Sequence, residues 1–211
     1  MGPKGYPQAR TQEARALERR RAKRVAKRLL KYACPFAVSD YERALNWYAT
    51  ARREIQRVYG EDWMIACGVI AATSPQVDVR MNGTLARAVI AHWREGTLKQ
   101  WTPWLPCHRK NVHRALKGAP LSGQKVEAFR LALLGHDEIV VDTWMLRAAG
   151  APSKAIHSGS PSWVRVTHEA IRLVALKLGW KQSETQAVIW SAYREQNWNS
   201  KKGVGTGALE V

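Results

Sequence analysis

The sequence predicts an all-α protein, and two kinds of observation support this fold class. Apolar residues recur at the three- and four-residue spacing of amphipathic helices along most of the chain. Two capping boxes, Ser39–Glu42 and Ser183–Gln186, are typical of helix starts. The strand-like segment Ile139–Val141 is too short to found a sheet. We therefore expect a compact domain of about eight short helices joined by tight glycine turns.

The composition indicates one domain with a substantial core and a polyanionic partner. The chain has 211 residues, of which 45% are hydrophobic, as in globular proteins. Its 34 Lys and Arg residues outnumber 17 Asp and Glu residues, so the net charge is +17. Such an excess points to nucleic acid or to an anionic membrane surface. No apolar run approaches the roughly 20 residues of a membrane span, and the charged N-terminus does not resemble a secretory signal. We expect a cytoplasmic monomer without a membrane partner.

The cysteines argue against a disulfide framework and against a metal site. Cys34, Cys67 and Cys107 are odd in number and far apart in the sequence. This spacing fits neither paired disulfides nor paired metal ligands. We expect reduced thiols in the core and no bound metal.

The N-terminal segment, residues 1–36, is predicted to be a basic helical arm. Eight Lys and Arg residues lie between positions 15 and 28, beside a thin apolar stripe. Two interpretations stay open: a solvated helix, and an arm that contacts DNA phosphates without reading sequence. A membrane-surface helix fits less well because the apolar face is poor. The main domain is expected at 37–200, and the Gly-rich segment 201–211 is expected to be a flexible tail.

Two helices are expected between residues 39 and 73. The first follows the Ser39 capping box and ends at Gly60. The second begins near Asp62 and is apolar on all sides up to Thr73. An all-apolar helix belongs in the centre of a domain.

Two more helices are expected between residues 78 and 118. Asp78 caps the first of them, which runs to Gly96. A stiff aromatic loop over 101–106 follows, either as a lid over the core or as a surface on which bases stack. The second helix is basic, and its His108 and His113 are expected at the surface because their spacing of five suits no shared metal.

The stretch Leu121–Arg147 carries the clearest chemical pattern in the chain. A glycine turn leads into an apolar helix with Lys125 in its first turn. A short apolar run then ends at Asp142, where another helix begins. By itself, this pattern leaves two interpretations open for each residue. Asp142 is either a functional carboxylate or only a helix cap, and Lys125 is either a functional amine or a surface lysine. Helices over about 163–178 and 183–198 complete the fold.

Two motifs resemble endonuclease III-type DNA glycosylases, which belong to the helix-hairpin-helix superfamily. The segment from Thr73 through Gln76 and Asp78 to Asn82 resembles the family's S-x-Q-x-x-D-x-x-x-N turn after an apolar helix. Pro120–Lys125, the following helix and Val140–Trp144 resemble its hairpin, lysine helix and V-D-T-H segment. The resemblance covers Trp63–Ala149 in patches and implies the compact helical fold of that superfamily.

The resemblance implies roles for individual residues. Asp142 would be the catalytic carboxylate that stabilises positive charge on the sugar or activates a nucleophile. Lys125 would be the amine that attacks the sugar carbon in members that also cleave the strand. Gln76, otherwise an ordinary turn residue, would fill the gap left by a flipped-out nucleotide. The implied partner is double-stranded DNA, contacted through its phosphates. The other DNA-contacting residues would be Ser122, Gly123, Gln124, Arg80, Arg109, Lys110, Trp144 and Arg147.

Several departures from the family pattern keep other functions open. Leu121 replaces the first hairpin glycine, Trp144 replaces the histidine after V-D-T, and the segment between Gln76 and Lys125 is short. No cysteine follows Cys107, so we expect no iron–sulfur cluster and no other cofactor. Short phage-encoded relatives that hypermodify DNA bases, such as thymine pyrophosphorylase-like enzymes, have similar patterns. Such a protein would act in the host cytoplasm or nucleoid. A DNA-binding module without catalysis is the third alternative.

Overall fold

A computed structural model describes residues 11–100 and 105–198, and this part of the chain is entirely helices, turns and loops. The all-α prediction is therefore confirmed for these residues. The chain forms two compact units. Within the described residues, unit 1 holds 11–47 and 137–198, and unit 2 holds 48–100 and 105–136. This division differs from the expected one at residue 36, because unit 1 is assembled from both ends of the described chain.

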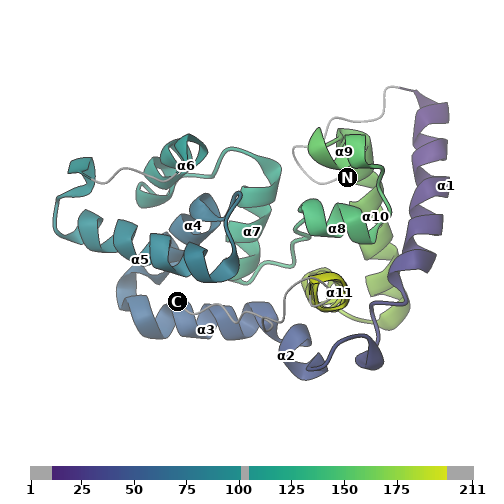
Figure 1. The fold of residues 1–211 in the computed structure, drawn as a ribbon, viewed down its shortest axis with the longest axis horizontal. Helices are drawn as coiled ribbons and strands as arrows, with labels where there is room; N and C mark the ends of the chain where they lie inside the picture. The colour runs from purple at the N-terminus through teal and green to yellow at the C-terminus, as the bar shows by residue number, and fades with distance from the viewer. Residues whose placement is uncertain (1–10, 101–104, 199–211) are drawn as a thin grey trace. The chain divides into compact units, whose positions relative to one another are not determined.

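Unit 1 is built on the packing of its first helix against a late one. In Figure 1, α1 runs alongside α10, and α11 contacts α2, α8 and α10. The core of the unit lies between these helices. Its elements are α1 (Gln12–Leu29), the 3₁₀ turn η1 (Pro35–Ala37), α2 (Tyr41–Leu45), α8 (Thr143–Ala148), α9 (Ser153–His157), α10 (Pro161–Leu178) and α11 (Gln182–Trp198).

Helix α1 is held to α10 by an apolar side and by an ion pair. Its buried side consists of Ala22, Val25, Ala26 and Leu29, the thin stripe that the sequence displays. Beside it, Arg165 Nε donates a 3.0 Å hydrogen bond to the Glu18 carboxylate. The buried side of the predicted arm is thus part of the unit 1 core, while residues 1–10 lie outside the described chain.

The Glu18–Arg165 pair leads to a pH-dependent prediction. Burial raises the pKa of the Glu18 carboxyl, but the hydrogen bonds and charge of Arg165 outweigh burial, so this pKa lies below its ordinary value. A lowered carboxyl pKa contributes stability that is present above the unfolded-state pKa and lost as the pH falls through the folded-state pKa. We expect Glu18→Gln to lower the free energy of unfolding by about 1 kcal/mol at about pH 7, and by less at about pH 3.

Denaturant titrations at the two pH values measure this difference. The matched control is Glu169→Gln, which breaks a Glu–Arg pair on the surface of α10, where Arg172 is 49% exposed. Exposed pairs contribute little, so the control is expected to change stability by no more than about 0.5 kcal/mol. Equal effects of the two variants at neutral pH would contradict a structural role for Glu18.

Unit 2 is arranged around helix α4, which the sequence predicts to be central. Residues 66–73 of α4 are all buried, and α5, α6 and α7 pack against the helix (Figure 1). Gly68 permits the close approach of α6: a Cβ there would lie 3.0 Å from the Ala115 Cβ. The elements are α3 (Trp47–Tyr59), η2 (Gly60–Asp62), α4 (Trp63–Thr73), α5 (Val79–Arg94), η3 (Leu98–Gln100), α6 (Pro106–Leu116) and α7 (Gln124–Leu134).

Both predicted capping boxes differ from the caps in the structure. Asp40, not Ser39, caps α2 by accepting a 3.0 Å hydrogen bond from the Arg43 amide. That helix ends at Leu45, so the long helix expected up to Gly60 is two helices. At the second box, the Ser183 amide and hydroxyl both donate to Asp137, at 2.8 and 2.9 Å. A carboxylate distant in sequence thus receives the donors at the start of α11.

The cysteines are less uniformly buried than expected. All three are free thiols, but Cys67 alone is buried, whereas Cys34 is half-buried and Cys107 is exposed. Burial raises the pKa of the Cys67 thiol to about 12, which makes it a poor nucleophile. The prediction of core thiols is therefore correct for Cys67 only.

Candidate functional site

The residues singled out in the sequence fall into two groups, one in each unit. Unit 1 contains Asp142, Trp144 and Arg147, and unit 2 contains Lys125, Gln76 and the remaining predicted DNA contacts. Each group is described within its own unit.

The turn before α7 is clamped by side chains of α6 and α7. Buried Asn111 accepts a 2.7 Å hydrogen bond from the Ser122 amide and donates one of 2.8 Å to the Ser122 carbonyl. The Leu121 amide donates to the Glu127 carboxylate at 2.7 Å. Gly123 has a φ of +105°, which residues with a Cβ rarely adopt. Ser122 and Gly123 are exposed, whereas Leu121 is a core residue, so the side chain that departs from the family pattern points into the protein.

Lys125 extends from the first turn of α7 to the end of α4. Its Nζ lies 2.9 Å from the Ser74 hydroxyl and 3.4 Å from the Ser74 carbonyl oxygen. Ser74 is the C-cap of α4, where backbone carbonyls concentrate partial negative charge. The amine is half-buried and directed at the turn that contains Gln76. The structure thus brings the predicted lysine and the predicted glutamine turn together.

The turn between α4 and α5 holds Gln76 in an unusual backbone conformation. Its φ is +62°, and among the described residues it is the non-glycine residue with a positive φ. The turn is fastened on both sides: the Pro75 carbonyl lies 2.9 Å from His108 Nε2, and the Thr73 hydroxyl lies 2.6 Å from Asn82 Oδ1. The Gln76 side chain itself is exposed. A strained turn with an exposed tip is typical of functional positions.

His108 corrects a prediction made from the sequence. It was expected at the surface, but its side chain is fully buried in α6 and hydrogen bonds to Pro75. His108, Asn111, Val112 and Ala115 form the buried side of α6 at helical spacing. This helical periodicity is visible in the sequence and would have predicted a buried His108. The five-residue spacing between His108 and His113 carries no information about burial.

Exposed cations lie at the starts of two helices of unit 2. Arg109 and Lys110 are exposed at the start of α6, and Arg80 is exposed in the first turn of α5. Helix α6 has no acidic residue along its length. These positions suit phosphate contacts, which need charge and reach more than a fixed geometry.

Asp142 in unit 1 is both a helix cap and the partner of a tryptophan. Its Oδ1 accepts a 2.8 Å hydrogen bond from the Met145 amide, as an N-cap does. Its Oδ2 accepts a 3.0 Å hydrogen bond from the indole nitrogen of Trp190 on α11. The two bonds fix the carboxylate in one orientation, and the side chain remains half-buried. Capping alone would leave the second oxygen unconstrained.

Arginine side chains lie over the ring of Trp190, the partner of Asp142, and over that of Trp144. The guanidinium of Arg194 lies 4.4 Å from the Trp190 ring centroid and 5.8 Å from that of Trp144. Arg147 lies 4.9 Å from the Trp144 centroid on α8. We call Asp142, Trp144, Arg147, Trp190 and Arg194 the Asp142 cluster. Carboxylate, indole rings and guanidinium groups together can hold a sugar, stack a base and neutralise a phosphate.

Trp190 and Arg194 are site candidates that the sequence motifs did not predict. They lie four residues apart on α11, so they share one side of the helix. The spacing was visible in the sequence, but the partner Asp142 lies 48 residues away from Trp190. A contact over that separation has no local signal.

The described residues contain neither a metal-binding cluster nor a membrane-spanning helix. No group of three or more His, Cys, Asp or Glu side chains there could hold a metal ion. None of the helices described in the structure is long and apolar enough to cross a membrane.

Comparisons with known proteins give one match, at the level of a family. No curated protein and no solved structure matches the chain significantly. A family model described as a family of unknown function, DUF7178, matches residues 10–197, which include all of the described residues except Trp198. The chain belongs to the DUF7178 family.

Proposed function

We propose that this protein is a DNA-binding enzyme that acts on a flipped-out base, and that its leading activity is that of a DNA glycosylase. One observation carries the proposal: the Asp142 carboxylate is held by Trp190 within a cluster of indole and guanidinium groups. The resemblance to endonuclease III-type glycosylases assigns the catalytic role to this same residue. In this proposal the fold is of the helix-hairpin-helix glycosylase type.

The chemistry assigned to Asp142 is electrostatic. Breaking the bond between base and sugar builds positive charge on the sugar. A nucleophile, which is water or the Lys125 amine, bonds to the sugar carbon as this bond breaks, and the proton that it loses goes to the leaving base. A carboxylate held in place before the reaction stabilises that charge without reorganisation. Trp190 and the Met145 amide hold Asp142 in this way, each through one carboxylate oxygen. Trp144 and Arg147 would then contact the base and a neighbouring phosphate.

Lys125 is assigned the second chemical step. Its nitrogen would bond to the sugar carbon as the bond to the base breaks. The bond from that carbon to the ring oxygen would then break to give a Schiff base, from which the 3′ phosphate leaves and the strand is cleaved. The placement of Nζ beside Ser74 supports this role by directing the amine at the Gln76 turn. The start of α7 at Gln124, beside the exposed residues Ser122 and Gly123, would present backbone amides to a phosphate.

Gln76 provides a test that separates function from stability. We expect Gln76→Gly to leave the free energy of unfolding unchanged or to raise it by up to about 1 kcal/mol, because glycine relieves the positive φ. We also expect it to slow base release from duplex DNA about tenfold, because no side chain then fills the gap left by the flipped nucleotide. Denaturant titration and a base-release assay measure the two effects.

Two outcomes distinguish the role of the Gln76 side chain from that of the turn. Gln76→Asn, which tolerates a positive φ and retains an amide, is the matched variant and should keep part of the activity. If Gln76→Gly destabilises the protein as much as it slows base release, the residue is a structural turn residue and the gap-filling role is wrong.

One measurement tests the proposed activity as a whole. Duplex DNA is incubated with the protein and with its Asp142→Asn variant, and free bases and nucleosides are then identified by mass spectrometry. Free base that depends on Asp142 supports a glycosylase, whereas an altered nucleoside supports the base-hypermodifying alternative. If the DNA is bound but chemically unchanged, the protein is a binding module and the proposed enzyme activity is wrong.

A further inference from the structure

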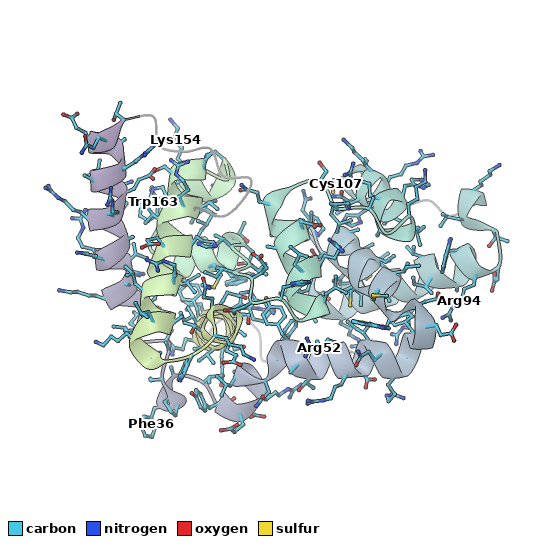
Figure 2. The ribbon with its side chains drawn as sticks, turned by 180° about the vertical axis from the view of Figure 1, so that it is seen from behind. Phe36, Arg52, Arg94, Cys107, Lys154 and Trp163 are labelled. Carbon is cyan, nitrogen blue, oxygen red and sulfur yellow. The ribbon has the colours of Figure 1, made fainter. Side chains whose placement is uncertain are left out.

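The outward side of α1 carries a row of cations that the proposed active-site residues do not include. Arg20, Lys23, Arg24 and Lys27 are all exposed. Lys23 and Arg24 are adjacent, and each lies three or four residues from both Arg20 and Lys27. We call these four residues the α1 stripe. In Figure 2, nitrogen-tipped side chains project from α1 on the side away from α10. Residues at this spacing share one side of a helix.

The structure separates the stripe from basic residues of α1 that have structural partners. The Arg21 guanidinium lies 5.1 Å from the ring centroid of Trp163, which Figure 2 labels on α10. Arg28 Nε donates a 2.8 Å hydrogen bond to the Ala148 carbonyl. These two arginines join α1 to the rest of unit 1. The sequence alone presents all of them as one undivided basic run.

The charge of the stripe is not neutralised within the described residues. Glu18 is occupied by Arg165, and no ion pair of the described chain joins any of the four stripe cations to an acid. The exposed acid Glu13 precedes Arg20 by seven residues, or about two helical turns. Four positive charges therefore lie along a helix length of about 10 Å.

We propose that the α1 stripe binds the phosphate backbone of duplex DNA outside the region where the base is processed. The inference rests on the proposed function in one respect: DNA is the substrate. A length of about 10 Å along duplex DNA carries about six phosphate charges, enough partners for all four cations. Phosphate contacts carry no base information, so the stripe adds affinity and orientation without selecting a sequence.

The buried side of α1 argues against a membrane as the partner. A helix that lies in a lipid surface inserts an apolar side between the headgroups. In α1 that side is Ala22, Val25, Ala26 and Leu29, which are buried in the core of unit 1. The remaining exposed large apolar residue of the helix is Leu17. Charge without an apolar side fits a polyphosphate backbone better than a bilayer.

The test replaces all four stripe residues with glutamine, which removes charge and keeps a similar helix propensity. Binding to an undamaged duplex is measured over a salt series from about 50 to about 200 mM. Each lost phosphate contact lowers the slope of log affinity against log salt by about 0.9, so we expect a decrease of about 3 to 4. At about 100 mM salt the affinity should fall at least about tenfold.

A matched variant controls for net charge. Glutamine at Arg43, Lys154, Lys177 and Lys181 removes the same charge from exposed positions of unit 1 outside α1. We expect this variant to lower the slope by less than about 1. Equal decreases for the two variants overturn the inference, because net charge alone then explains the binding. An unchanged slope for the stripe variant overturns it as well.

The assays also distinguish this inference from the proposed function. Stripe-dependent binding without base release or modification supports the stripe and refutes the enzyme activity. Base release with stripe-independent DNA binding refutes the stripe alone. Vesicles containing phosphatidylserine are the second probe: loss of vesicle binding in the stripe variant, with DNA binding retained, makes the partner a lipid surface and overturns the inference.

Discussion

Replacing Asp142 with asparagine is expected to lower the rate of base release by a factor of about 10² to 10³. The substitution removes the negative charge that would stabilise the developing positive charge on the sugar. Asparagine retains one oxygen, which can accept a hydrogen bond from either the Met145 amide or the Trp190 indole. Single-turnover rates of base release, with protein in excess over duplex DNA, measure the effect on the chemical step.

The loss of one hydrogen bond at Asp142 needs its own control. Asp40 caps α2 with the same bond to the amide three residues ahead. Asp40→Asn makes the same chemical change at a helix start that the proposed chemistry does not use. Both variants are expected to lose no more than about 1 kcal/mol of stability, because asparagine is also a good N-cap. Equal rates for Asp142→Asn and wild type would refute the catalytic role of Asp142.

Replacing Lys125 with alanine is expected to abolish a covalent adduct with DNA. If Lys125 forms a Schiff base, borohydride reduces it to a stable bond between the protein and a duplex with an abasic site. The variant lacks the amine, so gel electrophoresis should show no adduct. Base release that depends on Asp142 should persist at a reduced rate, because the carboxylate remains.

The neighbours of Lys125 define the control for this experiment. Losing the hydrogen bond between Nζ and the Ser74 hydroxyl should cost about 1 kcal/mol of stability, which thermal unfolding would reveal. Lys117→Ala removes an exposed lysine of the same unit and should leave the adduct intact. An adduct of undiminished yield in Lys125→Ala would mean that another amine attacks the sugar.

Much of the local structure follows from the sequence because its causes are local. The all-apolar run of α4 predicts a central helix, and residues 66–73 are buried as expected. Asp78 and Asp142 cap α5 and α8, with hydrogen bonds of 2.8 Å to the amides three residues ahead. Helix propensity, apolar periodicity and these two aspartate caps each depend on residues within a few positions, so the sequence predicts them.

The misplaced features share a dependence on contacts between distant segments. Asp137 takes the donors of α11 that the Ser183 box was expected to satisfy. His108 is buried because α6 presents it to the α4–α5 turn, where Pro75 accepts its hydrogen bond. Neither partner can be identified from local spacing, because many carboxylates and carbonyls in the chain could serve equally well.

The candidate site divides in the same way between sequence and structure. By itself, the sequence determined that the protein is helical and strongly basic, and that Lys125 and Asp142 each stand at a helix start. The tertiary structure alone decided that Trp190 binds the second oxygen of Asp142 and that Ser74 receives Lys125. It also decided which arginines of α1 join the helix to unit 1 and which remain exposed. The physical reason is that a helix start depends on its neighbours in sequence, whereas the environment of a side chain depends on which distant helices pack beside it.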